Sequence, residues 1–168
     1  MPADTHLTAS CICGRVALDM AGAPIVSLIC YCDDCQAAAR RIEARPAAPA
    51  VQGLDGGTAY VVYRKDRVQT TKGADLLEAF KLRPASPTNR VIASCCNTAM
   101  FLGFDDSKHW IDIYRARIGA IAPAPQMRVC TKFAPDTSRI PADLPRHAGY
   151  PFRLIAKLIG ARIGMLFG

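Results

Sequence analysis

The residues best suited to chemistry are the eight cysteines, seven of which fall into three clusters. The clusters are Cys11 with Cys13, then Cys30 with Cys32 and Cys35, and last Cys95 with Cys96. Clustered thiols in a reducing compartment are more often metal ligands than disulfides. Closely spaced cysteines suit zinc, which binds each sulfur at about 2.3 Å. The sequence therefore predicts a zinc-binding protein.

The central cluster, Cys30-Tyr31-Cys32-Asp33-Asp34-Cys35, has a Cys-x-Cys-x-x-Cys pattern. Two cysteines separated by two residues can turn the chain around one ion, and Cys30 supplies a third thiolate. Three protein ligands on a tetrahedral ion leave a fourth position open, as in catalytic zinc sites. We therefore interpret Cys30, Cys32 and Cys35 as a catalytic metal site. A structural zinc whose fourth ligand comes from elsewhere in the chain is the alternative.

The two outer clusters predict a second site that joins distant parts of the chain. Cys11 and Cys13 can point to one face of an extended segment, because side chains two residues apart share a face. Cys95 and Cys96 are neighbours, so both can bind one ion only if the chain turns there; otherwise Cys96 binds and Cys95 stays nearby. Structural zinc contributes about 10 kcal/mol or more to the folding of small modules.

The remaining candidate ligands are isolated in the sequence. Cys130 is interpreted as a buried free thiol, with a role as fourth ligand of one cluster as the alternative. His6, His109 and His147 are interpreted as surface or hydrogen-bonded core residues, and His109, next to Trp110, is the one to inspect.

The elements that position these residues are mostly strand-like. Alternating or β-branched segments predict strands, which are 15–20, 25–29, 59–63, 68–71, 76–82, 91–94, 99–102 and 110–114. Segments 59–63 and 68–71 are expected to form a hairpin across Arg64–Arg67. Asp33 or Asp34 is expected to cap a short helix from Cys35 to about Arg45, which Pro46 ends.

The chain ends in a segment that predicts a helix, residues 152–167, after a mostly loop-like stretch from 118 to 151. Arg153 and Lys157 fall on one face of this helix, with apolar residues around the rest. Such a helix can pack against the domain or a partner subunit, or lie on an anionic membrane as a peripheral contact. We expect two parts, a zinc-binding domain at 1–150 and a basic, apolar helical tail at 151–168.

Composition sets outer limits on function. The net charge is +7, and residues 61–168 carry seventeen Lys/Arg against eight Asp/Glu. This excess lacks interleaved aromatic residues and matches no helix-based DNA-reading motif, which argues against a nucleic-acid partner. The first residues lack a secretory pattern, and no apolar run reaches about 20 residues. The sequence thus predicts a cytoplasmic protein.

The cysteine motifs resemble those of the glutathione-dependent formaldehyde-activating enzyme family, also called the centromere-protein-V-like family. The family pattern is Cys-x-Cys-Gly-x-Val, Cys-His-Cys-x-x-Cys and Cys-x-x-Cys-Gly, similar to segments 11–16, 30–35 and 93–97 here. Within this superfamily the chain is most similar to a branch with a Cys-Tyr-Cys-Asp-Asp-Cys-Gln run, a Gly-Gly-Thr turn and a Cys-Cys pair. Tyr31 and Ala93 depart from the broader pattern, where His and Cys are usual.

The resemblance, which covers roughly residues 8–115, implies a mainly β fold of the β-tent type, with small antiparallel sheets around zinc. With the two helices expected from the sequence, the fold then has a short helix after the central cluster and a C-terminal helix. It implies a structural zinc at Cys11, Cys13 and Cys96, with Cys95 as a substitute ligand. It also implies a second zinc near the substrate at Cys30, Cys32 and Cys35, the same residues that their spacing predicts to be a catalytic metal site.

Two functional hypotheses follow. The first is a zinc-dependent carbon–sulfur lyase or thiol-adduct enzyme acting on a small-molecule thiol of the glutathione type, whose carboxylates Arg64, Lys65 and Arg67 could attract. The second is a non-catalytic, zinc-stabilised interaction module whose tail contacts a partner or a membrane, with oligomerisation also open. A fold hosts many functions, so the resemblance gives a class of reaction and leaves the substrate open.

Overall fold

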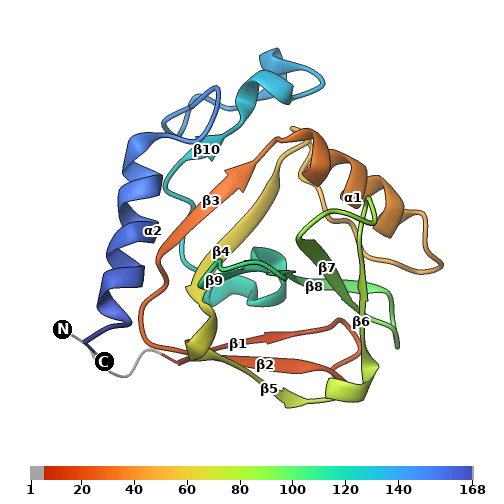
Figure 1. Cartoon of the computed structure of the whole chain (residues 1–168). Coiled ribbons are helices and arrows are strands. Elements are labelled where there is room, and N and C mark those ends of the chain that lie inside the picture. The colour runs from red at the N-terminus through yellow and green to blue at the C-terminus, as the bar shows by residue number, and fades with distance from the viewer. Residues whose placement is uncertain (1–5, 168) are drawn as a thin grey trace.

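The structure, a computed structural model, describes residues 6–167 and consists mainly of β-strands (Figure 1). The predicted mainly β class is confirmed. Residues 1–5 and 168 of the predicted domain and tail lie outside the described residues. The strands are β1 (His6–Ser10), β2 (Ala17–Ala21), β3 (Val26–Cys30), β4 (Thr58–Arg64), β5 (Val68–Lys72), β6 (Leu77–Phe80), β7 (Thr88–Ala93), β8 (Thr98–Phe104), β9 (Trp110–Tyr114) and β10 (Arg128–Val129). The helices are α1 (Asp33–Glu43) and α2 (Phe152–Gly164).

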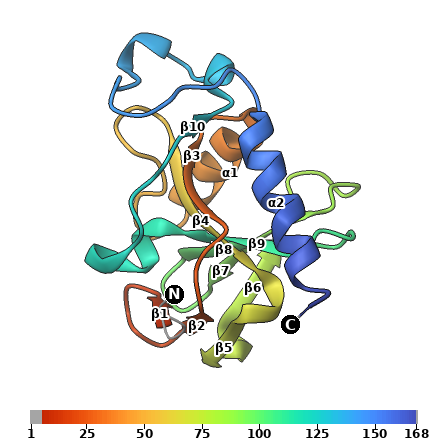
Figure 2. The same ribbon diagram turned by 90° about the vertical axis from the view of Figure 1, so that its left-hand side faces the viewer.

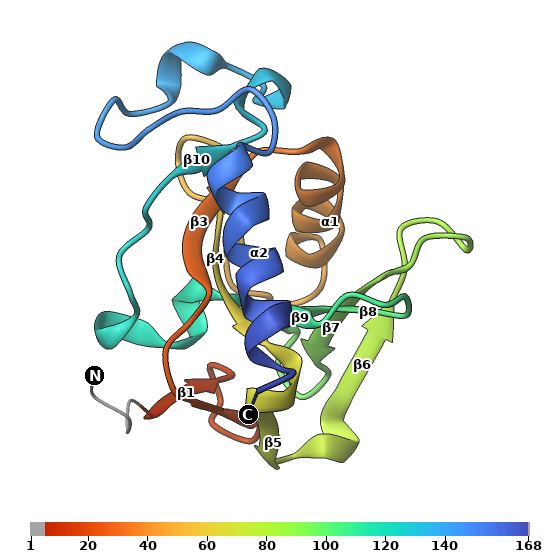
Figure 3. The ribbon, with the colours of Figure 1, turned by 60° about the vertical axis from the view of Figure 1, so that its left-hand side comes forward.

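The strands form two sheets. The smaller has the order β1-β2-β5, and the larger has the order β10-β3-β4-β9-β8-β7-β6. Neighbouring strands are antiparallel except β10, which runs parallel to β3. The small sheet lies at one end of the molecule, and both helices lie beside strands β3 and β4 (Figures 2 and 3).

The predicted hairpin between 59–63 and 68–71 is wrong. Strand β4 pairs with β3 and β9 in the large sheet, whereas β5 pairs with β2 in the small one. A short 3₁₀ turn, Lys65–Arg67, carries the chain from one sheet to the other. Strand β4 is buried on both faces and β5 is largely exposed. A simple hairpin would therefore have left β4 without the neighbours that its apolar surface requires.

Side chains of the large sheet alternate between two separate hydrophobic cores. On one face, Val61 and Ile113 pack with Leu18 of the small sheet. On the other face, Tyr60 and Tyr114 belong to a core that also contains the central cysteines and α2. The second face therefore carries the candidate site.

Helix α1 begins within the central cysteine cluster. Its N-cap is Cys32, whose sulfur accepts a hydrogen bond from the backbone N–H of Cys35 at 3.4 Å. The predicted cap at Asp33 or Asp34 is therefore wrong, because both lie in the first turn, where carboxylates suit the helix dipole. The cap holds the Cys32 sulfur at the helix N-terminus, an environment that stabilises thiolates.

Tyr31 fixes the chain between two of the central cysteines. Its fully buried hydroxyl donates to Asp55 Oδ2 at 2.7 Å, and Arg128 donates to both groups. A Cβ on Gly57 would lie 2.5 Å from Ile29 Cγ2 and 2.7 Å from Tyr31 Cζ, so only glycine lets this turn approach so closely. The Gly-Gly-Thr turn thus packs directly against the Tyr31 ring.

Replacement of this glycine tests the packing. We predict that Gly57→Ala lowers the free energy of unfolding by about 1–3 kcal/mol, because the added methyl overpacks a rigid contact. Gly149→Ala is the matched control, since nothing lies within 4 Å of its Cβ position. Urea unfolding of both variants provides the measurement, and equal losses in the two would contradict this account.

Candidate functional site

Four cysteines from the two outer clusters converge at one point. The sulfur of Cys13 lies 3.5 Å from that of Cys11 and 3.4 Å from that of Cys95, and the Cys11–Cys95 and Cys95–Cys96 distances are 3.9 and 3.8 Å. All four sulfurs lie within 4.8 Å of one another, so the group could hold a metal ion. Sulfurs on one tetrahedral zinc lie about 3.8 Å apart, so the spacing fits that ion.

Two turns bring these sulfurs together. Cys11 and Cys13 lie in a turn after β1, and Cys95 and Cys96 lie in the turn between β7 and β8. The second turn bends at Asn97, which has a φ of 52°, a conformation that Asn tolerates better than most residues. Adjacent cysteines can therefore face one point here, which they could not do within a strand.

Local charge prepares one of these thiols for ionisation. The backbone N–H and the side chain of Arg15 lower the pKa of Cys13 to about 6. By contrast, burial and hydrogen bonding to its sulfur neighbours raise the pKa of Cys95 to about 12. Thiolate is the form that binds metal, so Arg15 favours binding at this group.

The central cysteines form a second sulfur group at the start of α1. Cys30 ends β3, Cys32 caps α1 and Cys35 lies in its first turn, and the three sulfurs lie within 4.8 Å of one another. We call these residues the cysteine trio. Among residues 6–167, no fourth Cys, His, Asp or Glu lies within that distance of all three.

The thiols of the trio differ widely in pKa. Hydrogen bonds from Cys30 and Cys35 lower the pKa of Cys32 to about 2. The pKa of Cys30 is raised, first by its hydrogen bond with Cys130. Cys130 is buried, as predicted from the sequence, and it lies next to the trio as a neighbour of Cys30.

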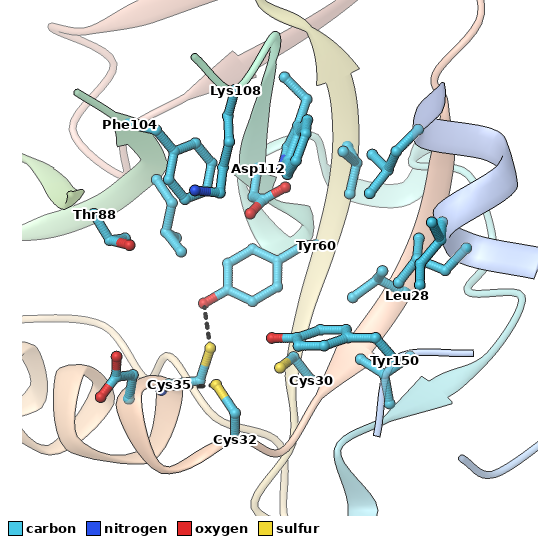
Figure 4. Close-up of a pocket in the computed structure, with 18 of the residues that line it drawn as sticks. Leu28, Cys30, Cys32, Cys35, Tyr60, Thr88, Phe104, Lys108, Asp112 and Tyr150 are labelled. Atoms are coloured by element: carbon cyan, nitrogen blue, oxygen red, sulfur yellow. Dashed lines mark hydrogen bonds between the residues drawn. The ribbon is translucent and has the colours of Figure 1, made fainter. Parts of the chain in front are cut away.

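The trio lies on the wall of a cavity of about 410 Å³ (Figure 4). Apolar side chains of β3, β4, β8 and α2 make up most of the wall. The cavity lies on the face of the large sheet that alternation turns away from the small sheet. Its polar lining residues are Asp34, Tyr60, Thr88, Arg90, Lys108, Asp112 and Tyr150.

Strand register places an arginine and an aspartate in one row across this face. Arg90 on β7 pairs with Leu102 on β8, Leu102 with Asp112 on β9, and Asp112 with Val62 on β4. Strand β8 therefore lies between the two charged residues, and neighbouring strands are spaced about 4.8 Å apart. No salt bridge joins them among the described residues.

Arg90 and Asp112 are unusually placed for charged residues. Arg90 is only 3% exposed, and its Nε and Nη1 atoms have no hydrogen-bond partner among the described residues. Asp112 points into the cavity, where burial raises the pKa of its carboxyl to about 7 against the opposing effect of Arg90 (Figure 4). A carboxyl that titrates near pH 7 can accept or donate a proton at neutral pH.

Tyr60 connects the trio with the middle of the cavity. Its hydroxyl lies 3.4 Å from the sulfur of Cys35, as the dashed line in Figure 4 marks. Burial raises its pKa well above the usual value, so the hydroxyl stays neutral and can donate to a thiolate.

The sequence did not single out Arg90, Asp112 or Tyr60. A clean alternation over 110–114 was visible, but it could not tell that the Asp112 face borders a cavity instead of solvent. The suggested Arg64, Lys65 and Arg67 are not among the cavity-lining residues, and Arg64 pairs with Asp66 at 2.6 Å.

His109 proves to be a hydrogen-bonded core residue, as predicted. It is 6% exposed, its Nε2 lies 2.8 Å from the carbonyl oxygen of Leu158, and its ring meets Trp110 edge-on. His109 therefore attaches α2 to the sheet beside the cavity.

With this geometry in hand, comparison with known proteins identifies the family. Residues 6–133 match the profile of the family described as glutathione-dependent formaldehyde-activating enzyme. The chain belongs to this family. The resemblance inferred from the cysteine motifs is thus confirmed over most of the chain.

Other comparisons add little beyond the family. A crystal structure of a Rhodobacter sphaeroides protein, a structural genomics target, is similar at 14% identity and a TM-score of 0.49, covering 70% of this chain and 92% of that one. No curated protein matches the chain. The family match ends before Tyr150 and α2, so this side of the cavity is built from residues outside the matched range.

We predict different outcomes when the two sulfur groups are altered. Cys13→Ser and Cys95→Ser should each lose one equivalent of bound metal and melt at far lower temperature, because the four-cysteine group ties β1 to the β7–β8 turn. Cys32→Ser should lose one equivalent with only modest destabilisation. Metal analysis and thermal melts provide the measurements, and equal damage in all three variants would contradict this division.

We also predict a pH-dependent stability that arises from Asp112. An unfolded aspartate ionises near pH ~3.9, whereas in the folded chain the pKa of Asp112 is about 7. Between these values the folded state holds a proton that the unfolded state has released, so wild-type stability falls as pH rises through this window. Asp112→Asn should remove that fall. Urea unfolding at several pH values, with the exposed Asp75→Asn as control, measures it; identical pH slopes in wild type and Asp112→Asn would refute the assignment.

Proposed function

We propose that this protein makes or breaks a carbon–sulfur bond between a small-molecule thiol of the glutathione type and an aldehyde. The observation that carries the proposal is the position of the cysteine trio on the wall of a largely apolar cavity that also contains Asp112. Family membership supports the thiol class, since the family's description names glutathione and formaldehyde.

We further propose that zinc is the metal at both sulfur groups, within a β-tent fold. The spacing of the four-cysteine group fits a closed tetrahedral site. The trio offers three thiolates and, among the described residues, no fourth ligand of the usual types. Zinc bound there would supply Lewis-acid or thiolate-binding chemistry at the cavity wall.

Side chains around the trio compensate its negative charge and exclude water from the cavity. Three thiolates in an apolar cavity need positive charge nearby. Hydrogen bonds from Cys30 and Cys35, together with the buried guanidinium of Arg90, lower the pKa of Cys32, and Arg90 opposes the effect of Cys32 and of burial, which raise the pKa of Cys35 to about 12. The Tyr60 hydroxyl can donate to the Cys35 sulfur. Apolar walls exclude water, which strengthens each of these interactions.

Asp112 is the proposed proton carrier. Its carboxylate takes the proton from the substrate thiol, the sulfur lone pair forms the bond to the carbonyl carbon, and the C=O π electrons move to the oxygen. The Asp112 carboxyl then returns the proton to that oxygen, giving a hemithioacetal. The reverse sequence cleaves the adduct, so atoms and charge balance in both directions.

Substrate charge can be met inside the cavity. A glutathione-type thiol carries carboxylates, and Arg90 and Lys108 are the cationic residues that line the cavity. Lys108 also pairs with Asp106, which holds its ammonium near the ring of Phe104.

Turnover tests the proposal. We predict that zinc-loaded protein accelerates exchange between formaldehyde, glutathione and their adduct, measured by NMR, with a kcat/KM that rises as pH increases through about 7 because free Asp112 must be ionised. Asp112→Asn should lower the rate by about 10²–10⁴-fold and flatten that rise. Asp75→Asn serves as the control. Zinc-loaded wild type without acceleration for any tested aldehyde would favour the non-catalytic module.

A further inference from the structure

Helix α2 carries an apolar stripe that is exposed on the surface of the protein. Phe152, Ile155, Ile159 and Ile163 are 80, 44, 54 and 51% exposed. Their spacing of three, four and four residues places them on one helical face. Leu166 and Phe167, which follow the helix, are also exposed.

The stripe is not a core face left without its partner, because α2 already packs with its opposite side. Leu154 is buried in the core that contains the trio, and Leu158 packs against the same core. The bond from His109 to the Leu158 carbonyl fixes that side to the sheet. Figures 1 and 3 show α2 running alongside β3.

Cations alone accompany the stripe. Arg153, Lys157 and Arg162 are exposed on α2, and residues 151–168 contain no Asp or Glu. At 100° per residue, Arg162 lies beside one edge of the stripe, Arg153 lies beyond the other edge, and Lys157 lies further round the helix, away from the stripe. The surface therefore combines a narrow apolar band with positive charge on both sides.

The combination of an apolar stripe with flanking cations favours one of two possible binding partners for α2. A second copy of the chain would meet the stripe through a two-fold axis and set the flanking cations, Arg153 and Arg162, against the same cations of the other copy. An anionic bilayer offers acyl chains to the stripe and negative headgroups to its edges, the arrangement typical of interfacial helices. No helix in the described part of the chain is long and apolar enough to span a membrane, so the contact would lie along the surface.

We propose that α2 docks this protein in the plane of an anionic membrane surface, with Phe152, Ile155, Ile159 and Ile163 in the headgroup–acyl boundary. The proposal is independent of the reaction in the cavity. It has one structural consequence for the site: Tyr150 and Ile155 line the cavity and are also exposed, so docking sets that edge of the cavity beside the lipid.

Vesicle sedimentation tests the proposal with the zinc-loaded full chain. Wild type should pellet with phosphatidylcholine vesicles that contain 30% phosphatidylglycerol and stay in the supernatant with pure phosphatidylcholine. Ile159→Ser combined with Ile163→Ser should weaken binding at least tenfold, whereas Ile121→Ser, at an exposed position away from α2, should not. Arg153, Lys157 and Arg162 changed together to Gln should also weaken binding at least tenfold.

A second set of variants separates docking from the general attraction of a basic protein. The matched control changes three exposed cations elsewhere, Lys132, Arg139 and Arg146, to Gln. Equal losses from this triple and the α2 triple, or from the apolar double variant and Ile121→Ser, would overturn the proposal. A dimer in sedimentation velocity that dissociates in the apolar double variant, with no vesicle binding by wild type, would assign the stripe to a second copy instead. Thermal melts check that each variant remains folded.

Discussion

The alternation of side chains along the large sheet is the constraint on which the core and the cavity both depend. Each strand sends one set of residues toward the small sheet and the other toward the helices. Strand β9 illustrates this, since Ile113 enters one core while Asp112 and Tyr114 face the other side. Register then aligns Arg90, Leu102 and Asp112 in a row. A shift of one residue would bury the aspartate among aliphatic side chains and remove it from the cavity.

The two sulfur groups use turns in opposite ways. The four-cysteine group joins two turns that are distant in sequence, and so connects the small sheet to the β7–β8 end of the large one. The trio occupies a single local turn, from the end of β3 into α1, and borders the cavity. A closed set of four thiolates suits structure, and a set of three beside a cavity suits chemistry. The same residue type can therefore serve both purposes within one small domain.

The departures from the family pattern have local physical explanations. Tyr31, where histidine is usual, turns its hydroxyl into a buried network with Asp55 and Arg128 and so anchors the trio's turn from the far side. Ala93 lies within strand β7, and Cys95, two residues later in the turn, reaches the sulfur group in its place. The positive φ of Asn97 makes that turn possible at the position where the family has glycine.

Local pattern was enough to determine the family, the mainly β class, most strands, both helices and the grouping of the cysteines, because motif spacing and alternation are properties of neighbouring residues. Local pattern did not determine which strands pair with one another. The hairpin predicted for β4 and β5 was wrong because β4 pairs with β3 and β9 and is buried on both faces by residues distant in the sequence. Arg90, Asp112 and Tyr60 lie on three different strands, so only the tertiary register could bring them to one cavity. The exposed stripe of α2 was likewise decided by packing: the helix has apolar residues on several sides, and only contact with the sheet determines which of them stay exposed.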